Sequence, residues 1–247
     1  ITSFFSRYKN ELEKIFFLFF SIFLFIFIGF RYQVGGDWYN YIYFYDLTRY
    51  SSLNAVILGG DPGYNLLNFL GNSLGYSDTI FVNVVCAFLI LLFLTKLALK
   101  LKAFWLFFLV YYPYHIVVVS NGYTRQAVAI SICLWGVYKL LQNKRKKFIF
   151  FILLAAMFHK TAIVFFLLFP VVFLYYIKNN LKYLMAIYSF FSFILIVFLL
   201  NFLGMQESNI YLQGNEEMSS KGFFVRWTYH VIPLIIFYKY NNFFKTY

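Results

Sequence analysis

The stretch TIFVNVVCAFLILLFLT, residues 79–95, is apolar and contains no charged side chain. A helix needs about 20 residues to cross the hydrocarbon of a bilayer, with a range of about 17–25. About eight runs along the chain share this character, at roughly 14–30, 79–95, 103–120, 123–141, 148–159, 161–177, 183–203 and 223–239. We therefore predict an all-α fold, a polytopic integral membrane helix bundle.

The composition of the chain agrees with this prediction and excludes an ordinary soluble domain. Hydrophobic residues make up 62% of the chain, with 36 Phe and 23 Tyr, whereas soluble domains contain about 45–50% apolar residues. The net charge of +12 does not indicate a nucleic-acid partner, because most Lys and Arg lie in the breaks between apolar runs. We expect one transmembrane domain over residues 1–247, and the opening at Ile1 without a methionine is compatible with truncation.

The basic residues also predict the orientation of the bundle. With the N-terminus inside, most of the 21 Lys and Arg lie on the inner face, as the positive-inside rule requires. Making residues 62–76 a full span would move the Lys96–Lys102 cluster outside, so we predict an amphipathic or re-entrant helix at the outer surface. Asp61 is its expected N-cap. The short run 148–159 requires a break at His159-Lys160.

Four basic residues on the predicted outer side lie against helix ends or inside apolar sequence, namely Arg31, Arg125, Lys160 and Arg226. A charged group at mid-bilayer depth costs about 2.5–3.5 kcal/mol, so it usually faces a cavity or a partner. Each could alternatively extend to the outer headgroups. Arginine suits phosphate because its planar guanidinium donates bidentately. Together the four predict a receptor for a diphosphate whose lipid tail lies between helices.

Two residues are candidates for proton transfer. Asp37, in QVGGDWY, either accepts a proton or caps the helix that starts at Trp38. His159 adjoins Lys160 in otherwise apolar sequence, where it is either a structural group or a base. Cys86 and Cys133 are expected to be buried thiols, and no metal-binding motif is present, so we expect neither a metal nor a cofactor.

The aromatic residues beside Asp37 allow two interpretations. Trp38 and Tyr41 belong either to the aromatic belt at the membrane interface or to a platform on which a sugar stacks. Gln126, next to Arg125, is a further candidate for sugar binding.

Four ordered motifs resemble those of a known family. They are Gly35-Gly36-Asp37-Trp38-x-x-Tyr41, Asp61-Pro62-Gly63-Tyr64, Arg125-Gln126-x-x-Ala129 and His159-Lys160-Thr161-Ala162. This set resembles the EpsG family, which includes Wzy-type polymerases of bacterial O-antigens, capsules and exopolysaccharides. The resemblance implies a GT-C-like glycosyltransferase of the bacterial inner membrane that works at the periplasmic or outer face.

The resemblance also implies the substrates and partners. Two polyprenyl-diphosphate-linked repeat units would bind, with undecaprenyl diphosphate as the carrier, and membrane lipid and a chain-length regulator protein are further expected partners. Arg125 and Arg226 would clamp the diphosphate, supported by Arg31 and Lys160, and Asp37 or His159 would be the general base. The alternatives are a transporter or flippase of lipid-linked oligosaccharide, an O-antigen ligase, and a non-catalytic membrane scaffold.

Overall fold

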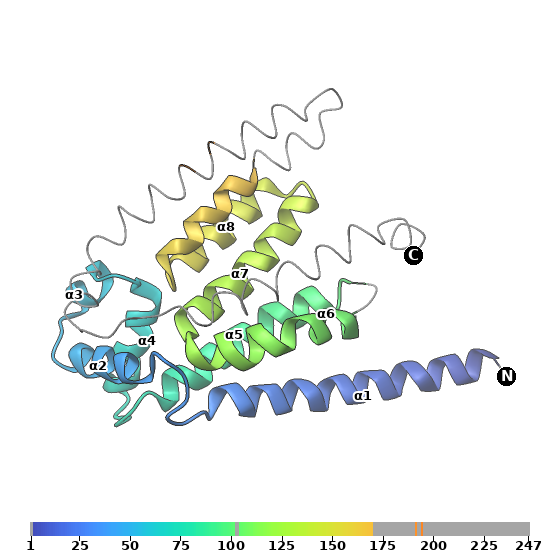
Figure 1. The fold of residues 1–247 in the computed structure, drawn as a ribbon, viewed down its shortest axis with the longest axis horizontal. Coiled ribbons are helices and arrows are strands. Elements are labelled where there is room, and N and C mark those ends of the chain that lie inside the picture. The colour runs from blue at the N-terminus through green and yellow to red at the C-terminus, as the bar shows by residue number, and fades with distance from the viewer. Residues whose placement is uncertain (1, 102–103, 170–190, 192–193, 195–247) are drawn as a thin grey trace. The chain divides into compact units, whose positions relative to one another are not determined.

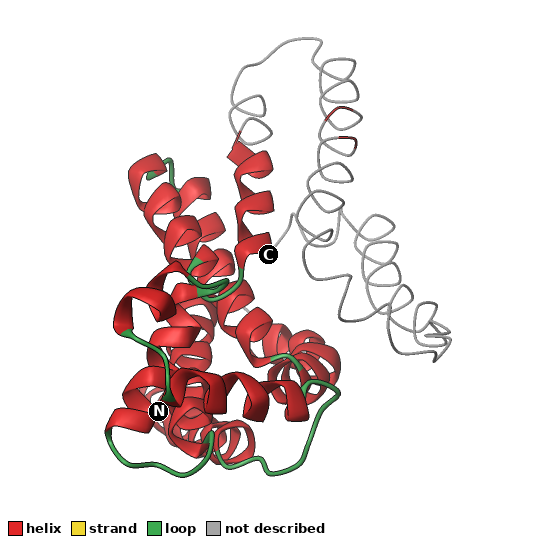
Figure 2. Cartoon of the chain, turned by 90° about the vertical axis from the view of Figure 1, so that its left-hand side faces the viewer, coloured by secondary structure: helices red, strands yellow, loops and turns green. Residues whose placement is uncertain are grey.

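The computed structural model of the protein describes residues 2–101 and 104–169 together with residues 191 and 194. Within these ranges the regular structure is helical throughout (Figures 1 and 2). The elements are α1 (Thr2–Gly29), α2 (Trp38–Arg49), α3 (Leu53–Leu58), α4 (Pro62–Ser73), α5 (Ile80–Ala98), α6 (Phe104–Tyr111), the π-helix η1 (Tyr112–Ser120), α7 (Thr124–Leu141), α8 (Arg145–Ala156) and the 3₁₀-helix η2 (Lys160–Leu167).

Two of these helices are long and apolar enough to cross a membrane. Leu12–Gly29 of α1 and Ile80–Ala98 of α5 meet both criteria, and Trp105–Ser120 is a shorter apolar stretch. The five apolar runs predicted between residues 14 and 159 coincide with α1, α5, the pair α6–η1, α7 and α8. The structure describes the predicted run 161–177 only as far as residue 169. Of the run 183–203 it describes residues 191 and 194 alone, and the run 223–239 lies outside the described residues.

The bundle is centred on α5, which packs against α1 and α7. Val82, Cys86, Ile90 and Leu94 of α5 are completely buried. Small side chains allow the close approach, since a β-carbon at Gly29 of α1 would lie 3.4 Å from the β-carbon of Ala87. Close contact through small residues is typical of helices that associate within a membrane, where the hydrophobic effect does not drive their packing.

The predicted break at His159 is confirmed. Helix α8 ends at Ala156, His159 is extended (φ −156°, ψ 113°), and η2 begins at the next residue. Phe148 near the start of α8 contacts Phe166 and Phe169 at ring distances of 5.9 and 6.2 Å. The chain therefore reverses at His159, and η2 runs back beside α8.

The short helices α2, α3 and α4 gather at one end of the long helices (Figure 1). They pack on one another, and α4 also contacts α5. Helix α4 occupies the place predicted for a surface or re-entrant helix and buries Tyr64, Asn68 and Gly71. We call α2, α3 and α4 with their connecting loops the surface layer.

The lysines collect at the other end of the bundle. Lys139 at the end of α7 interacts electrostatically with Lys96 and Lys100 at the end of α5, and with Lys144 and Lys147 around the start of α8. The surface layer lies at the opposite end of α5, because the chain passes from α4 through a short loop into the start of that helix. The lysine-rich segments and the segments that carry Arg31, Arg125 and Lys160 therefore lie at opposite ends of the long helices.

Candidate functional site

Asp61 is the centre of a polar cluster in the surface layer. It is the N-cap residue of α4, but its side chain makes no capping hydrogen bond to that helix. Instead Oδ2 accepts a hydrogen bond from Nη1 of Arg125 at 2.9 Å, and Oδ1 accepts one from the backbone N–H of Lys160 at 3.1 Å. The carboxylate is only 5% exposed. A buried carboxylate needs such partners, because an unpaired buried charge is costly.

The backbone explains why Asp61 reaches residues so distant in sequence. The N–H of Gly63, in the first turn of α4, donates to the carbonyl oxygen of Met157 at 2.7 Å. A β-carbon at Gly63 would lie 3.0 Å from this oxygen, so a larger side chain would force the segments apart. The glycine thus allows the start of α4 to lie directly on the end of α8.

Arg125 lies in the first turn of α7 with its guanidinium among aromatic rings. The distances from its Cζ to the ring centroids are 5.2 Å for Phe44, 5.7 Å for Tyr41 and 5.9 Å for Tyr64. Aromatic faces attract a cation at such distances. Burial raises the pKa of Tyr41, so its hydroxyl keeps its proton at neutral pH. The Arg125 side chain is 22% exposed and therefore retains access from outside.

His159 lies on the other side of the same carboxylate. Its Nδ1 is 3.7 Å from Oδ2 of Asp61, and this nitrogen is buried without a hydrogen bond. That distance is longer than a hydrogen bond, so the imidazole lies next to the carboxylate without bonding to it. The side chain of His159 is 24% exposed, so part of the ring reaches the surface.

Arg31 lies close by but is engaged by the protein itself. Its Nη1 donates to the carbonyl oxygens of Ser120, at 2.9 Å, and Asn121, while its Nη2 donates to Oδ1 of Asn83, at 3.1 Å, and to the hydroxyl of Thr124. The residue is 8% exposed. The carbonyl oxygens at the C-terminal end of a helix carry partial negative charge, so a cation is stabilised there. Arg31 therefore links the end of α1 to the junction of η1 and α7. Arg125 follows directly after that junction.

A model of the EpsG family matches residues 14–247 of this chain. The chain belongs to the EpsG family. No curated protein and no solved structure matches it. EpsG membership makes the protein a membrane protein of the polysaccharide polymerase type, with lipid-linked saccharide as the general class of substrate.

The structure brings three of the four EpsG motifs into direct contact. Asp61 of the second motif meets Arg125 of the third and His159-Lys160 of the fourth. The first motif contributes Tyr41, whose ring lies beside Arg125. Residues of these motifs, far apart in sequence, thus gather at one place in the fold.

The other predicted site residues occupy different surroundings. Asp37 is half-buried before α2, and its side chain makes no capping hydrogen bond to that helix. Trp38 and Tyr41 are buried, whereas Gln126 is exposed. Arg226 lies outside the described residues. Among the described residues, no three His, Cys, Asp or Glu side chains gather in a group that could hold a metal ion.

Asp61 is the residue that sequence reasoning missed as part of the site. Its position before Pro62 indicated an N-cap. Because this local role was sufficient to explain the residue, its long-range partners were not predicted. One signal could have revealed it: the chain has nine Asp and Glu against 21 Lys and Arg. Acidic residues are therefore scarce in this chain, and an acidic residue on the side of the bundle where Arg and Lys adjoin apolar sequence is expected to pair with one of these cations.

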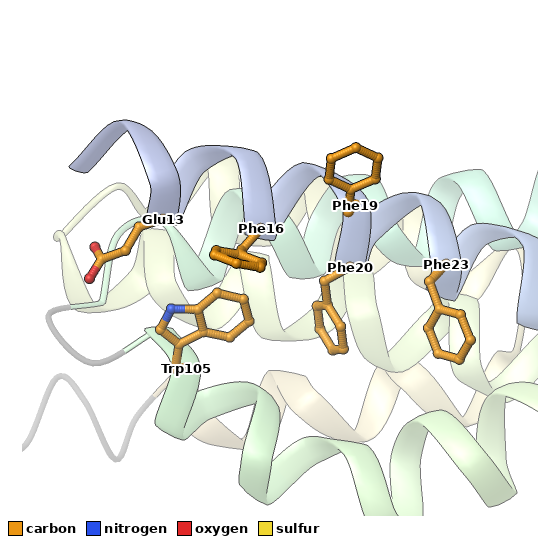
Figure 3. Close-up of a pocket in the computed structure, with 6 residues that line it drawn as sticks. All are labelled: Glu13, Phe16, Phe19, Phe20, Phe23 and Trp105. Carbon is orange, nitrogen blue, oxygen red and sulfur yellow. The ribbon is translucent and has the colours of Figure 1, made fainter. Parts of the chain in front are cut away.

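A second hollow lies away from this cluster. It is an apolar groove of about 590 Å³ on α1 and the start of α6, lined by Glu13, Phe16, Phe19, Phe20, Phe23 and Trp105. Figure 3 shows Phe16 next to the indole of Trp105, with Phe20 and Phe23 projecting from the same side of α1 farther along the helix. Its lining contains no basic side chain, so the groove lacks the groups that bind a diphosphate.

Proposed function

We propose that this protein is a metal-independent membrane glycosyltransferase that polymerises polyprenyl-diphosphate-linked oligosaccharide repeat units into a surface polysaccharide. The observation that carries the proposal is the cluster of Asp61, Arg125, His159 and Lys160, assembled at one end of the bundle. It combines the guanidinium of Arg125, which can stabilise the charge of a leaving diphosphate, with the imidazole of His159, which can accept a proton. Family membership supports the same class of substrate.

In this proposal Arg125 is the main contact of the diphosphate and Lys160 supports it, while Arg226, which lies outside the described residues, is a further proposed ligand. Asp61 occupies one terminal nitrogen of the Arg125 guanidinium and thereby fixes its plane. Arginine has five N–H donors, so others remain for phosphate oxygens. When the sugar–diphosphate bond breaks, its electron pair leaves with the diphosphate. Cations already in place stabilise that charge without reorganising during the reaction.

The acceptor hydroxyl must lose a proton as its oxygen bonds to the anomeric carbon. Two residues remain candidates for this base. His159 directs Nδ1 toward Asp61, which leaves Nε2 for the acceptor, and the Asp61 carboxylate would stabilise the imidazolium that forms. Asp37 is the alternative, since its carboxylate is not used to cap α2.

We propose that Arg31 has a positioning role rather than the direct contact with the diphosphate that was expected from the sequence. Because both of its terminal nitrogens bind protein acceptors, it positions the segment that carries Arg125. We retain diphosphate contact by Arg31 only as a secondary possibility that requires release of those acceptors. Trp38, Tyr41 and Gln126 remain the proposed contacts of the sugar.

The proposed location is the bacterial inner membrane, with the N-terminus and the lysine end inside and the cluster facing the periplasm or outside. Undecaprenyl diphosphate is the proposed carrier, and a chain-length regulator is a proposed partner. A flippase of the same lipid-linked oligosaccharide and an O-antigen ligase are the alternatives. Purified protein that elongates lipid-linked repeat units without a transport step or lipid A core excludes both.

The direct test is the substitution Arg125→Ala. We expect roughly a 100- to 1,000-fold loss of polymerisation, the range found when one charge-stabilising donor is removed. Polymer length on a gel, in cells with equal membrane levels of the protein, measures it. Arg145→Ala is the control, an exposed arginine at the lysine end. A normal polymer ladder from Arg125→Ala would refute the proposal.

A further inference from the structure

A small hollow in the surface layer has the composition of a carbohydrate site. It lies between α2 and the loop before α5 and has a volume of about 200 Å³. Its lining consists of Tyr32, Gln33, Trp38, Tyr39, Ile42, Tyr45, Asp46, Ser77, Asp78 and Thr79. Drug-sized pockets measure about 300–1,000 Å³, so this one is suited to a single sugar ring.

Aromatic rings form one wall of the hollow. Trp38 is 7% exposed and packs edge-on against Tyr32, with 5.6 Å between the ring centroids. Tyr45 is held by a hydrogen bond from its hydroxyl to the carbonyl oxygen of Tyr76 at 2.9 Å. Tyr39 is 77% exposed and stands at the rim. Fixed aromatic rings at a wet surface offer apolar faces with polar edges, which match the faces and hydroxyls of a sugar.

The charged groups around the hollow are carboxylates, which accept hydrogen bonds. Asp78 uses Oδ1 to accept the N–H of Ile80 at 2.8 Å, so Oδ2 is left for a ligand. Asp46 contacts Arg49 at 3.4 Å, and its side chain is 55% exposed. Gln33 has a positive φ of 52°, a conformation uncommon outside glycine. Its amide lies 3.4 Å from the Tyr32 hydroxyl.

The charges of this lining differ in sign from those of the Asp61 cluster. Asp46 and Asp78 are the charged residues among those that line the hollow, and no basic residue is among them. Carboxylates accept hydrogen bonds from sugar hydroxyls or ammonium groups, but they repel a phosphate or a uronic acid. The basic residues Arg125 and Lys160, which suit a diphosphate, lie on α7 and η2, where these helices meet Asp61 of the surface layer.

We infer that this hollow is a saccharide subsite that takes one neutral or amino sugar of the lipid-linked chain and rejects anionic groups. The inference rests on the proposed function and specifies where its substrate is held. Tyr41, beside Arg125, comes three residues after Trp38 on α2, which is about 4.5 Å along the helix axis and on a neighbouring part of the helix surface. The hollow therefore adjoins the Arg125 cluster, and the subsite holds a sugar close to the bond that reacts.

Saturation-transfer NMR on the full chain in detergent tests the inference. The probes are the methyl glycosides of glucose, glucosamine, N-acetylglucosamine and glucuronic acid. We expect transfer to at least one of the first three and none to the glucuronide. Tyr39→Ala should weaken binding by roughly two- to tenfold, the range that one aromatic contact contributes. Tyr50→Ala, an exposed tyrosine of the same region outside the lining, should leave binding unchanged.

A charge variant separates recognition from a loss of folding. Asp46→Asn removes one of the two lining carboxylates, so the glucuronide should gain measurable transfer. Equal binding of all four probes to the unaltered protein, binding of none, or identical results for Tyr39→Ala and Tyr50→Ala would overturn the inference. Arg125→Ala distinguishes the two proposals, because it should lower polymerisation by roughly 100- to 1,000-fold and leave probe binding intact.

Discussion

His159 and Asp37 differ in what their neighbours allow them to do. The imidazole of His159 faces Asp61 at 3.7 Å, whereas Asp37 makes no capping hydrogen bond at the start of α2. A carboxylate beside an imidazole orients the ring and stabilises its protonated form. At the scale of single residues, the geometry therefore favours His159 as the base over Asp37.

A pair of substitutions tests this preference. If His159 is the base, His159→Gln removes the group that accepts the proton and should slow polymerisation by about 100- to 10,000-fold. Asp37→Asn should keep most of the rate. The measurement is the initial polymerisation rate of the unaltered protein and the two variants at equal membrane levels. A large loss of rate in Asp37→Asn together with a normal rate in His159→Gln would assign the base to Asp37.

Only part of the site was predictable at this scale. The four motifs contain Asp61, Arg125, His159 and Lys160, but their sequence did not show that Asp61 is the partner of the other three. Asp61 is 64 residues from Arg125 and 99 from Lys160, and local patterns do not encode pairings at such separations. The engagement of Arg31 by Asn83 and Thr124 was unpredictable for the same reason.

At the scale of elements, the loop between α1 and α2 docks on the junction of η1 and α7. Gly35 has a φ of 99°, and a β-carbon there would lie 2.4 Å from Cα of Gly122. The loop thus needs glycine both for its backbone conformation and for the contact. The paired glycines were expected to form a turn, but their contact partner could be seen only in the structure.

A pair of glycine substitutions separates these two requirements. Gly75 has a similar φ of 84° but nothing within 4 Å of its missing β-carbon. Gly75→Ala should therefore cost only the conformational penalty, about 1–2 kcal/mol. Gly35→Ala should lower the melting temperature in detergent substantially more, because the clash is added. Equal shifts in melting temperature for the two variants would contradict close docking of the loop.

For the long helices, apolar runs predicted their existence and approximate limits, since burial in lipid demands continuous apolar sequence. They did not predict the π-helical turn of Tyr112–Ser120 or the 3₁₀ form of η2. Those forms depend on which carbonyl each N–H reaches after packing. Hydropathy carries no information about that choice.

For the whole molecule, the charge distribution predicts one orientation in the membrane. The lysine end carries Lys96, Lys139 and Lys144, and the surface layer carries the site at the opposite end. The positive-inside rule then places the surface layer outside the cytoplasm.

Cysteine labelling tests this orientation. Tyr50→Cys, beside the end of α2, and Gln142→Cys, after α7, introduce exposed thiols at the two ends. An impermeant maleimide should label the first in intact spheroplasts and the second only after permeabilisation. The native Cys86 and Cys133 are buried, so the unaltered protein should give little background. The reverse labelling pattern would place the site in the cytoplasm.

The contact between Asp61 and its distant partners has a consequence for biogenesis. The acid leaves the ribosome 64 residues before Arg125 and 99 before Lys160. During that interval it lacks both partners, and a carboxylate without them is costly to remove from water. The cluster therefore assembles only after the α8–η2 hairpin has been synthesised, and until then the start of α4 is expected to stay hydrated at the membrane surface.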